Sequence, residues 1–155
     1  MSLVRQERPI QQMHFRLLSD LAEVEKLLDR FERFAATRLS AMVYWQSQTA
    51  LVEWFTNVVR YAHRDLPVQT PIPLGFTLFP SYLEMRIWDQ GQPFDLQGKI
   101  AEVLKQEDDL TKEGGRGLRW IHNLTDEYQY IRPTPDYNCL ILRKRIDPPL
   151  DPELF

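Results

Sequence analysis

The 155-residue sequence has little of what several classes of protein require. It contains one cysteine, Cys139, which excludes an intramolecular disulfide and a cysteine-based metal site. The three histidines, His14, His63 and His122, lack the spacing of zinc ligands. No run approaches the roughly 18 apolar residues that span a bilayer, and residues 1–12 lack the apolar segment of a secretion signal. We therefore expect a cytoplasmic protein that does not enter a membrane.

The chain also lacks a strong excess of one charge. Its formal net charge is -3, from 19 basic and 22 acidic residues, so neither direct nucleic-acid binding nor a polybasic membrane anchor is expected. Apolar residues make up 43% of the chain and charged residues 26%, as in ordinary globular proteins. The length favours one domain over residues 1–155, with a core at about 11–146 and a loose tail at 147–155.

Hydrophobic periodicity predicts an α+β fold. Strands are expected at residues 11–18, about 74–79, 82–88, 127–132 and 137–145. Helices are expected from Leu21 to Phe34, from about 41–45 to 63–66, and at 100–110 and 118–124. Asp20 and Glu23 have the pattern of an N-cap and its reciprocal partner, and Pro67 cannot continue the second helix. Strands in adjacent hairpins and grouped helices favour a two-layer α/β sandwich, with helices on one face of a mixed, mainly antiparallel sheet.

The stretch from Leu51 to Arg64 is predicted to be a helix with an apolar face and a chemically useful polar face. Its apolar residues recur at helical spacing. Glu53 and Asn57 are four residues apart, so their side chains point the same way, one turn above the other. This arrangement could hold a hydroxyl group and a metal ion side by side. An ordinary solvated stripe has the same pattern.

Two glycine-containing segments are further candidates for ligand contacts. Asp89-Gln90-Gly91 follows a predicted strand, where a carboxylate could accept a hydrogen bond from an exocyclic amine and a glycine allows close approach of a flat ligand. A plain turn is the alternative. Residues 114–117, Gly-Gly-Arg-Gly, precede a predicted helix, whose N-terminal N–H groups could bind an anion. The alternative is a flexible linker, and neither a P-loop nor a Rossmann motif is present.

Taken together, these motifs resemble the nucleotide-binding boxes of the GHKL superfamily, whose domain is the Bergerat-type ATP-binding fold. The matching motifs are Glu53-x-x-x-Asn57 in a helix, Asp89-x-Gly91 after a strand, and Gly115-x-Gly117-Leu118 before a helix. Their order and spacing most resemble the anti-sigma-factor serine/threonine kinases, whose boxes correspond to EWFTNVVRY and EGGRGLRWI here. The resemblance extends from about Phe15 to Lys144.

The resemblance implies a role for each matched residue. Glu53 would be catalytic and would orient or accept the proton of the attacking hydroxyl, while Asn57 would coordinate the Mg²⁺ that bridges the ATP phosphates. Asp89 would bind the adenine amino group, and Gly91 would allow the base to approach. The segment 94–113 would form a lid. The remaining implied nucleotide contacts are Arg60, Tyr61, Gly115, Arg116, Gly117 and Leu118.

Three positions depart from the family pattern. Tyr61 stands where the family usually has histidine, and Pro93 stands where a second glycine is common. Cys139 is assigned to the position where many relatives have a threonine that touches the base. His63 is interpreted as a helix-end or surface histidine rather than as a substitute base.

The resemblance implies an ATP-dependent protein serine/threonine kinase that acts as an anti-sigma factor. It would sequester a sigma factor, phosphorylate an antagonist of the STAS type and form a homodimer. The alternative is a non-catalytic, nucleotide-gated protein-binding module of the same fold. A detached histidine-kinase catalytic domain and an α+β domain without nucleotide are further alternatives. A client in a phosphatase-linked response module, instead of a sigma factor, also remains open.

Overall fold

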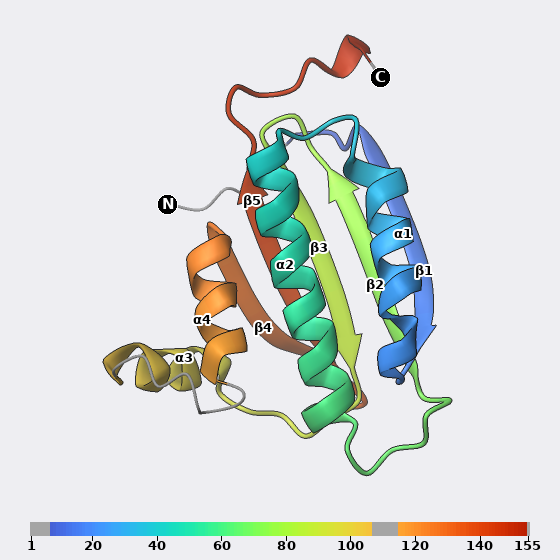
Figure 1. Cartoon of the computed structure of the whole chain (residues 1–155), viewed down its shortest axis with the longest axis vertical. Coiled ribbons are helices and arrows are strands. Elements are labelled where there is room, and N and C mark those ends of the chain that lie inside the picture. The colour runs from blue at the N-terminus through green and yellow to red at the C-terminus, as the bar shows by residue number, and fades with distance from the viewer. Residues whose placement is uncertain (1–6, 107–114, 155) are drawn as a thin grey trace.

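A five-stranded sheet forms one layer of the protein in the computed structural model, which describes residues 7–106 and 115–154 (Figure 1). The strands are β1 (Gln11–Leu18), β2 (Pro71–Leu78), β3 (Tyr82–Asp89), β4 (Glu127–Thr134) and β5 (Tyr137–Arg145). They lie in the order β1-β2-β3-β5-β4, and every neighbouring pair is antiparallel. The sequence predicted β1 and β5 with these bounds; β1 alternates between apolar and polar residues, whereas β5 contains a continuous apolar run at residues 139–142. The other strands differ from prediction only at their ends.

Helices form the second layer, on one face of the sheet (Figure 1). They are α1 (Val24–Ala35), α2 (Ala41–Asn57) with its continuation η2 (Val58–Ala62), α3 (Leu96–Lys105) and α4 (Gly115–Leu124); short turns of 3₁₀ helix lie at η1 (Leu21–Glu23) and η3 (Pro152–Leu154). The predicted α+β class, with helices on one face of a mainly antiparallel sheet, is confirmed.

Local capping explains where the first two helical segments with side-chain caps, η1 and α2, begin. Asp20 accepts a hydrogen bond from the Ala22 N–H at 3.0 Å, as predicted for an N-cap. Glu23 does not return a bond to Asp20; its carboxylate accepts the Leu18 N–H at 2.9 Å and so joins the helix start to the end of β1. The cap of α2 is Ser40, whose Oγ accepts the Val43 N–H at 3.3 Å.

The two later helices begin earlier than the sequence predicted. The N-terminal bound of α3 is Leu96 rather than residue 100, because the Asp95 carboxylate accepts the Gly98 N–H at 3.0 Å and caps it. The helix α4 starts at Gly115, so two glycines assigned to a loop belong to its first turn. Residues 107–110 of the third predicted helix, and 111–114 of the glycine loop, lie outside the described residues.

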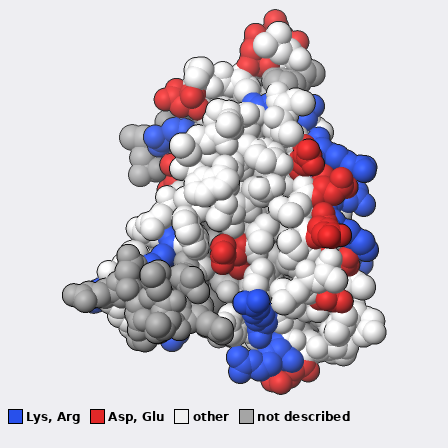
Figure 2. Space-filling view, in the orientation of Figure 1, with Lys and Arg blue, Asp and Glu red and all other residues white. Residues whose placement is uncertain are grey.

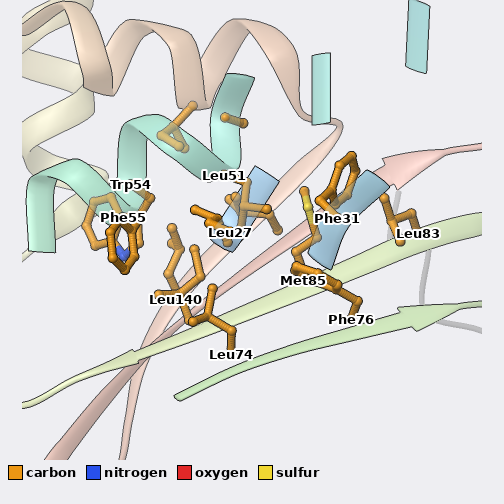
Figure 3. Packing of buried hydrophobic residues seen from close by; sticks show 14 of the residues in the cluster. Leu27, Phe31, Leu51, Trp54, Phe55, Leu74, Phe76, Leu83, Met85 and Leu140 are labelled. Carbon is orange, nitrogen blue, oxygen red and sulfur yellow. The ribbon is translucent and has the colours of Figure 1, made fainter. Parts of the chain in front are cut away.

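The hydrophobic core fills the space between the sheet and the helices (Figure 3). Phe76 of β2 lies near its centre, with its ring centroid 5.3 to 5.5 Å from those of Phe15, Phe31 and Phe34. From α2, Leu51 and Phe55 are fully buried. The predicted apolar face of the second helix is therefore confirmed. Because that face is anchored in the core, the polar residues of the same helix are held in fixed positions.

The second helix ends in a π-helical segment rather than in regular α-helix. The His63 N–H donates to the Val58 carbonyl at 2.8 Å, a bond that spans five residues. Segments of this kind act as one extra residue in an α-helix and often occur at functional sites. Beyond Asn57, side chains therefore no longer follow the 3.6-residue spacing that the sequence analysis assumed.

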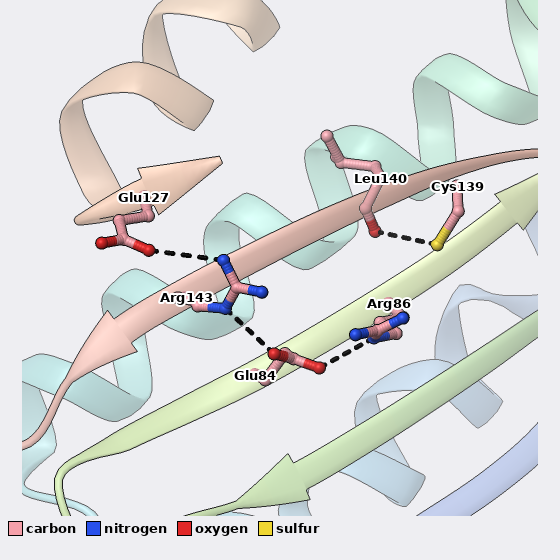
Figure 4. Close-up of polar contacts among 6 residues, drawn as sticks. All are labelled: Glu84, Arg86, Glu127, Cys139, Leu140 and Arg143. Atoms are coloured by element: carbon pink, nitrogen blue, oxygen red, sulfur yellow. Dashed lines mark hydrogen bonds and ion pairs between the residues drawn. The ribbon is translucent and has the colours of Figure 1, made fainter. Parts of the chain in front are cut away.

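Figure 1 shows no described helix over the opposite face of the sheet, where a network of charged side chains lies. Glu84 accepts from Arg86 Nε at 2.7 Å and from Arg143 Nε at 3.0 Å, and Arg143 Nη1 lies 3.3 Å from Glu127 Oε2 (Figure 4). Cys139 is also buried on this face, and burial raises the pKa of its thiol to about 12. The thiol is therefore protonated at neutral pH.

Candidate functional site

A cavity of about 600 Å³ lies where the second helix, the segment after β3 and the two later helices meet. Small-molecule sites commonly have volumes of about 300–1,000 Å³. Its wall is formed by Trp54, Asn57, Val58, Tyr61, Ala62, Asp65, Gln92, Phe94, Lys99 and Leu118. Three of these, Asn57, Tyr61 and Leu118, were predicted from the sequence to contact a ligand. The cavity is the candidate site.

Gly117 brings the start of α4 against the polar face of α2. A Cβ atom at Gly117 would lie 3.2 Å from Glu53 Oε2 and 3.3 Å from Asn57 Nδ2. These contacts are closer than side chains normally allow, so the glycine is what permits the approach. The predicted catalytic residue, the predicted metal ligand and the second glycine box therefore lie together, although they are 60 residues apart in the chain.

The Asp89 carboxylate is completely buried at the end of β3. Its Oδ1 accepts the Gly91 N–H and the Asn138 Nδ2 amide, each at 2.9 Å. Its Oδ2 accepts the Tyr130 hydroxyl at 2.8 Å. Asp89 is not among the residues that line the cavity. The carboxylate is thus bonded by protein donors and is separated from the open space.

The residue beside Asp89 is Asn138, whereas the family resemblance had assigned Cys139 to the position that touches the base. β3 and β5 pair so that Asp89 is opposite Asn138. Since side chains alternate between the faces of a strand, Cys139 points to the other face. The assignment was wrong by one residue, and in a strand such a shift exchanges the two faces.

Gly91 is held tightly against the π-helical segment. A Cβ atom there would lie 2.8 Å from the Ala62 Cβ and 3.0 Å from the Ala62 carbonyl oxygen. The absence of a side chain at Gly91 is therefore required by packing of the protein itself. The close approach of a base, which the resemblance implies, stays a prediction.

His63 is a helix-end residue, as interpreted, but it is not on the surface. Only 2% of it is exposed. Its Nε2 accepts the Gln90 N–H at 2.9 Å, and its Nδ1 lies 3.1 Å from Ser19 Oγ. Burial lowers the pKa of His63, although the nearby Asp89 charge opposes this shift. The imidazole is therefore a neutral structural link, with its proton on Nδ1.

Of the other predicted ligand contacts, one lines the cavity and the rest do not or lie outside the described residues. Tyr61 lies on the cavity wall, is 41% exposed, and has the Arg64 guanidinium 5.8 Å from its ring centre. Arg60 is exposed and is not one of the lining residues. Gly115 begins α4. The Arg116 side chain, like residues 107–113 of the expected lid, lies outside the described residues.

Sequence reasoning missed the aromatic part of the site. Trp54 is 3% exposed, and its indole N–H has no hydrogen-bond partner within the described part of the chain. Its ring centre lies 6.3 Å from that of Phe94 and 5.5 Å from that of Tyr130. Trp54 resembles any core residue in the sequence. Phe94, an aromatic residue within a polar turn segment, was a signal that could have been used.

The charged groups on the cavity wall suit a ligand that brings its own charge. Lys99 and Asp65 contribute one group of each sign. Among the described residues, no three His, Cys, Asp or Glu side chains lie close enough together to hold a metal ion. Mg²⁺ in phosphate sites commonly has only one or two protein ligands, and the remainder are phosphate oxygens and water. The donor set around Asn57 fits that mode of binding.

The family of this chain follows from comparison with known proteins. The model of the histidine kinase-like ATPase domain family matches residues 17–144, which is most of the chain. The protein therefore belongs to the histidine kinase-like ATPase domain family.

Curated relatives within this family carry the name serine-protein kinase RsbW. The protein from Staphylococcus epidermidis is 33% identical over 85 residues, which cover 52% of this chain and 54% of the relative. The protein from Oceanobacillus iheyensis is 29% identical over 107 residues, covering 63% and 62%. That from Bacillus licheniformis is 33% identical over 82 residues, covering 50% and 51%. The matches thus span about half to three-fifths of these relatives. They confirm the resemblance to the anti-sigma serine kinases as a family.

Proposed function

We propose that the protein is an ATP-dependent serine/threonine kinase that acts as an anti-sigma factor. It binds Mg²⁺ and ATP in the cavity and transfers a phosphoryl group to a STAS-type antagonist. It also sequesters a sigma factor. The observation that carries this proposal is the approach of Gly117 to Glu53 and Asn57, because it brings a carboxylate and a helix N-terminus beside Asn57, which lines the cavity.

The site has the features that a nucleotide requires. The first turn of α4 presents backbone N–H groups that favour phosphate. Lys99 adds a positive charge at the wall. The indole N–H of Trp54, which has no partner among the described residues, is a donor that a ligand acceptor could satisfy. The proposed nucleotide contacts remain Asn57, Arg60, Tyr61, Asp89, Gly91, Gly115, Arg116, Gly117 and Leu118.

Phosphoryl transfer depends mainly on position and charge, so few protein groups are needed. Asn57 would hold Mg²⁺, which supplies neutralising charge to the phosphates when it is bound. The Glu53 carboxylate would orient the hydroxyl of the partner and accept its proton. Gly117 leaves room for both side chains at the start of α4.

A phosphotransfer assay tests the kinase proposal. Purified protein, Mg·ATP and a STAS protein encoded beside it should yield phosphorylated STAS protein. Glu53→Ala should lower the rate by about 10²-fold or more, the usual contribution of a general base. Glu25→Ala, which removes an exposed carboxylate of α1, is the control and should leave the rate unchanged. Absence of transfer from the wild type to any such partner would contradict the kinase proposal.

A second candidate is a nucleotide-gated binding module without kinase activity. The enclosure of Asp89 by protein donors favours it, and so does Tyr61, which cannot carry a proton near neutral pH as histidine can. In that case Glu53→Ala would capture the partner as well as the wild type, and neither protein would transfer phosphate. Loss of transfer in Glu53→Ala from an active wild type would exclude it.

The remaining expectations concern assembly and location. We propose a cytoplasmic homodimer that contacts protein partners and not nucleic acid. Among the described residues on the helix side there is no extended basic area, and their acidic and basic groups lie mainly along the α1 edge (Figure 2). Within the described ranges, no helix is long and apolar enough to cross a membrane. Light scattering tests the dimer, and a pull-down distinguishes a sigma factor from a phosphatase-linked client.

A further inference from the structure

We propose that Tyr130 is a gate between the cavity and the Asp89 carboxylate, and that it determines how strongly the site selects a purine with an exocyclic amine. This inference rests on the proposed nucleotide binding. The Tyr130 hydroxyl occupies Asp89 Oδ2, so such an amine reaches this oxygen in competition with the hydroxyl. Tyr130 is thus a specificity-determining residue outside the sequence motifs.

The surroundings of the three donors to Asp89 show which of them can be displaced from the carboxylate. Gly91 donates from its backbone, and Gly91 is wedged against Ala62. Asn138 is fixed because its Oδ1 accepts from Arg132 Nη1 at 2.9 Å, and its Nδ2 also donates to the Gly91 carbonyl at 2.9 Å. Tyr130 is bonded through a terminal hydroxyl, which a modest rotation of the side chain removes.

The Tyr130 hydroxyl is always available to compete for Asp89. Burial and the neighbouring Asp89 charge both raise the pKa of Tyr130 well above its usual value. The phenol therefore remains protonated and donates to the carboxylate at every physiological pH. Hydrogen bonds to charged groups are among the stronger ones in proteins, so an entering amine has to replace a favourable contact.

Two aromatic rings stand between this hydrogen bond and the open cavity. Trp54 and Phe94 both line the cavity, whereas neither Tyr130 nor Asp89 does. The Tyr130 ring centre lies 5.0 Å from that of Phe94 and 5.5 Å from that of Trp54. Trp54 is anchored in α2 and is 3% exposed.

Of the two rings, Phe94 is the one that can move. It is 42% exposed and lies in residues 90–95, a segment without helix or strand. Movement of Phe94 away from Tyr130 would give the phenol space to rotate, and Asp89 would then face the cavity. In this gate Trp54 stays fixed, and the rings of Phe94 and Tyr130 move.

Calorimetry with two nucleotides tests the gate. ATP and purine riboside 5′-triphosphate differ in the exocyclic amine, and each is titrated with Mg²⁺ into wild type, Tyr130→Phe and Tyr128→Phe. Tyr130→Phe should bind ATP about tenfold more tightly, because the competing hydrogen bond to a charged group is gone. Its affinity for purine riboside triphosphate should stay the same. Tyr128 lies two residues away on β4 and bonds to His122 instead of Asp89, so Tyr128→Phe should resemble the wild type.

The ratio of the two affinities separates gating from general damage, which would weaken both nucleotides alike. ATP binding with an unchanged ratio in Tyr130→Phe would overturn the gate and leave the proposed function intact. Binding of neither nucleotide to any of the three proteins would overturn both.

A second variant keeps the test valid if Tyr130→Phe folds poorly. Phe94→Ala removes the exposed ring without touching the Asp89 hydrogen bonds, and it should raise the association rate of ATP severalfold in stopped-flow tryptophan fluorescence. An unchanged or slower association rate would overturn the gate.

Discussion

The imidazole of His63 accepts the backbone N–H of Gln90 at 2.9 Å, directly after the last residue of β3. The other ring nitrogen lies 3.1 Å from Ser19 Oγ, after β1. One buried side chain at the end of the second helix thus connects two strand ends. The bond from Gln90 requires the neutral imidazole, because Nε2 acts as its acceptor.

The first prediction is that His63 makes the stability depend on pH. Its pKa is lowered in the folded state by burial, so the unfolded chain takes up a proton more readily than the folded one. The free energy of unfolding should therefore be highest above about pH 6.5 and fall as the pH drops below it, by at most about 1.4 kcal/mol per pH unit. Urea unfolding at pH 7.5, 6.5 and 5.5 measures this slope.

Two variants identify the source of that slope. His63→Gln should be less stable at pH 7.5 but should lose less on acidification than the wild type. His122→Gln changes an exposed histidine and should keep the full slope. Equal slopes for wild type and His63→Gln would show that another group is responsible.

The second prediction concerns the contact between Gly91 and Ala62. In Gly91→Ala the new Cβ would meet the Ala62 Cβ at 2.8 Å and backbone atoms at 3.0 and 3.1 Å. Overpacking against backbone should lower the free energy of unfolding by about 2 kcal/mol. Ala62→Gly in the same protein removes one of the three clashes and should restore part of the loss. Urea unfolding of both single variants and the double variant measures these changes in the free energy of unfolding. If the losses of the two single variants simply add in the double variant, direct contact is contradicted.

The third prediction separates stability from nucleotide binding at Gly117. Alanine is favoured over glycine in a helix by about 0.5–1 kcal/mol, so Gly117→Ala should not lower the free energy of unfolding. The new Cβ should nevertheless displace Glu53 and Asn57 and reduce the thermal shift caused by Mg·ATP. Asn123→Ala, on an exposed position of the same helix, is the control and should keep the shift. An undiminished shift in Gly117→Ala would place the phosphates elsewhere.

The fourth prediction compares two arginines that share Glu84. The Arg143 side chain is 11% exposed and joins two carboxylates, whereas that of Arg86 is 40% exposed and joins one. Arg143→Met should lower the free energy of unfolding by about 2 kcal/mol or more, because it leaves a buried carboxylate poorly paired. Arg86→Met should cost less than about 1 kcal/mol. Equal losses in urea unfolding would contradict this difference.

Strand positions could be predicted well because each strand carries its own apolar pattern and is bounded by turn residues. The bounds of β1 and β5 follow from residues within each segment. The start of α3 could not be placed, since it depends on the single Asp95 cap in a weakly patterned region. The π-helical segment was also missed, because nothing local distinguishes it from α-helix.

Some residues of the candidate site could likewise be predicted from the sequence, and others could not. The family resemblance predicted that one site contains Glu53, Asn57 and Gly117. The structure places Gly117 within contact range of the other two side chains. Tyr130 was not found, because its bond to Asp89 crosses from β4 to β3 past β5. That contact depends on the register of three strands, and the one-residue error at Asn138 shows that this register was not available from pattern alone.

The π-helical segment Val58–Ala62 also determines how the protein tolerates insertions and deletions. Each residue of an α-helix turns the chain by about 100°. Removal of one residue from this segment would restore regular α-helix and leave His63 directed toward Ser19 and Gln90, because a π-helical turn holds one residue more than an α-helical turn. Glu53 and Asn57, which precede the segment, would keep their orientation. The segment therefore absorbs one residue between the part of the helix that presents the polar pair and the part that anchors the ends of the strands.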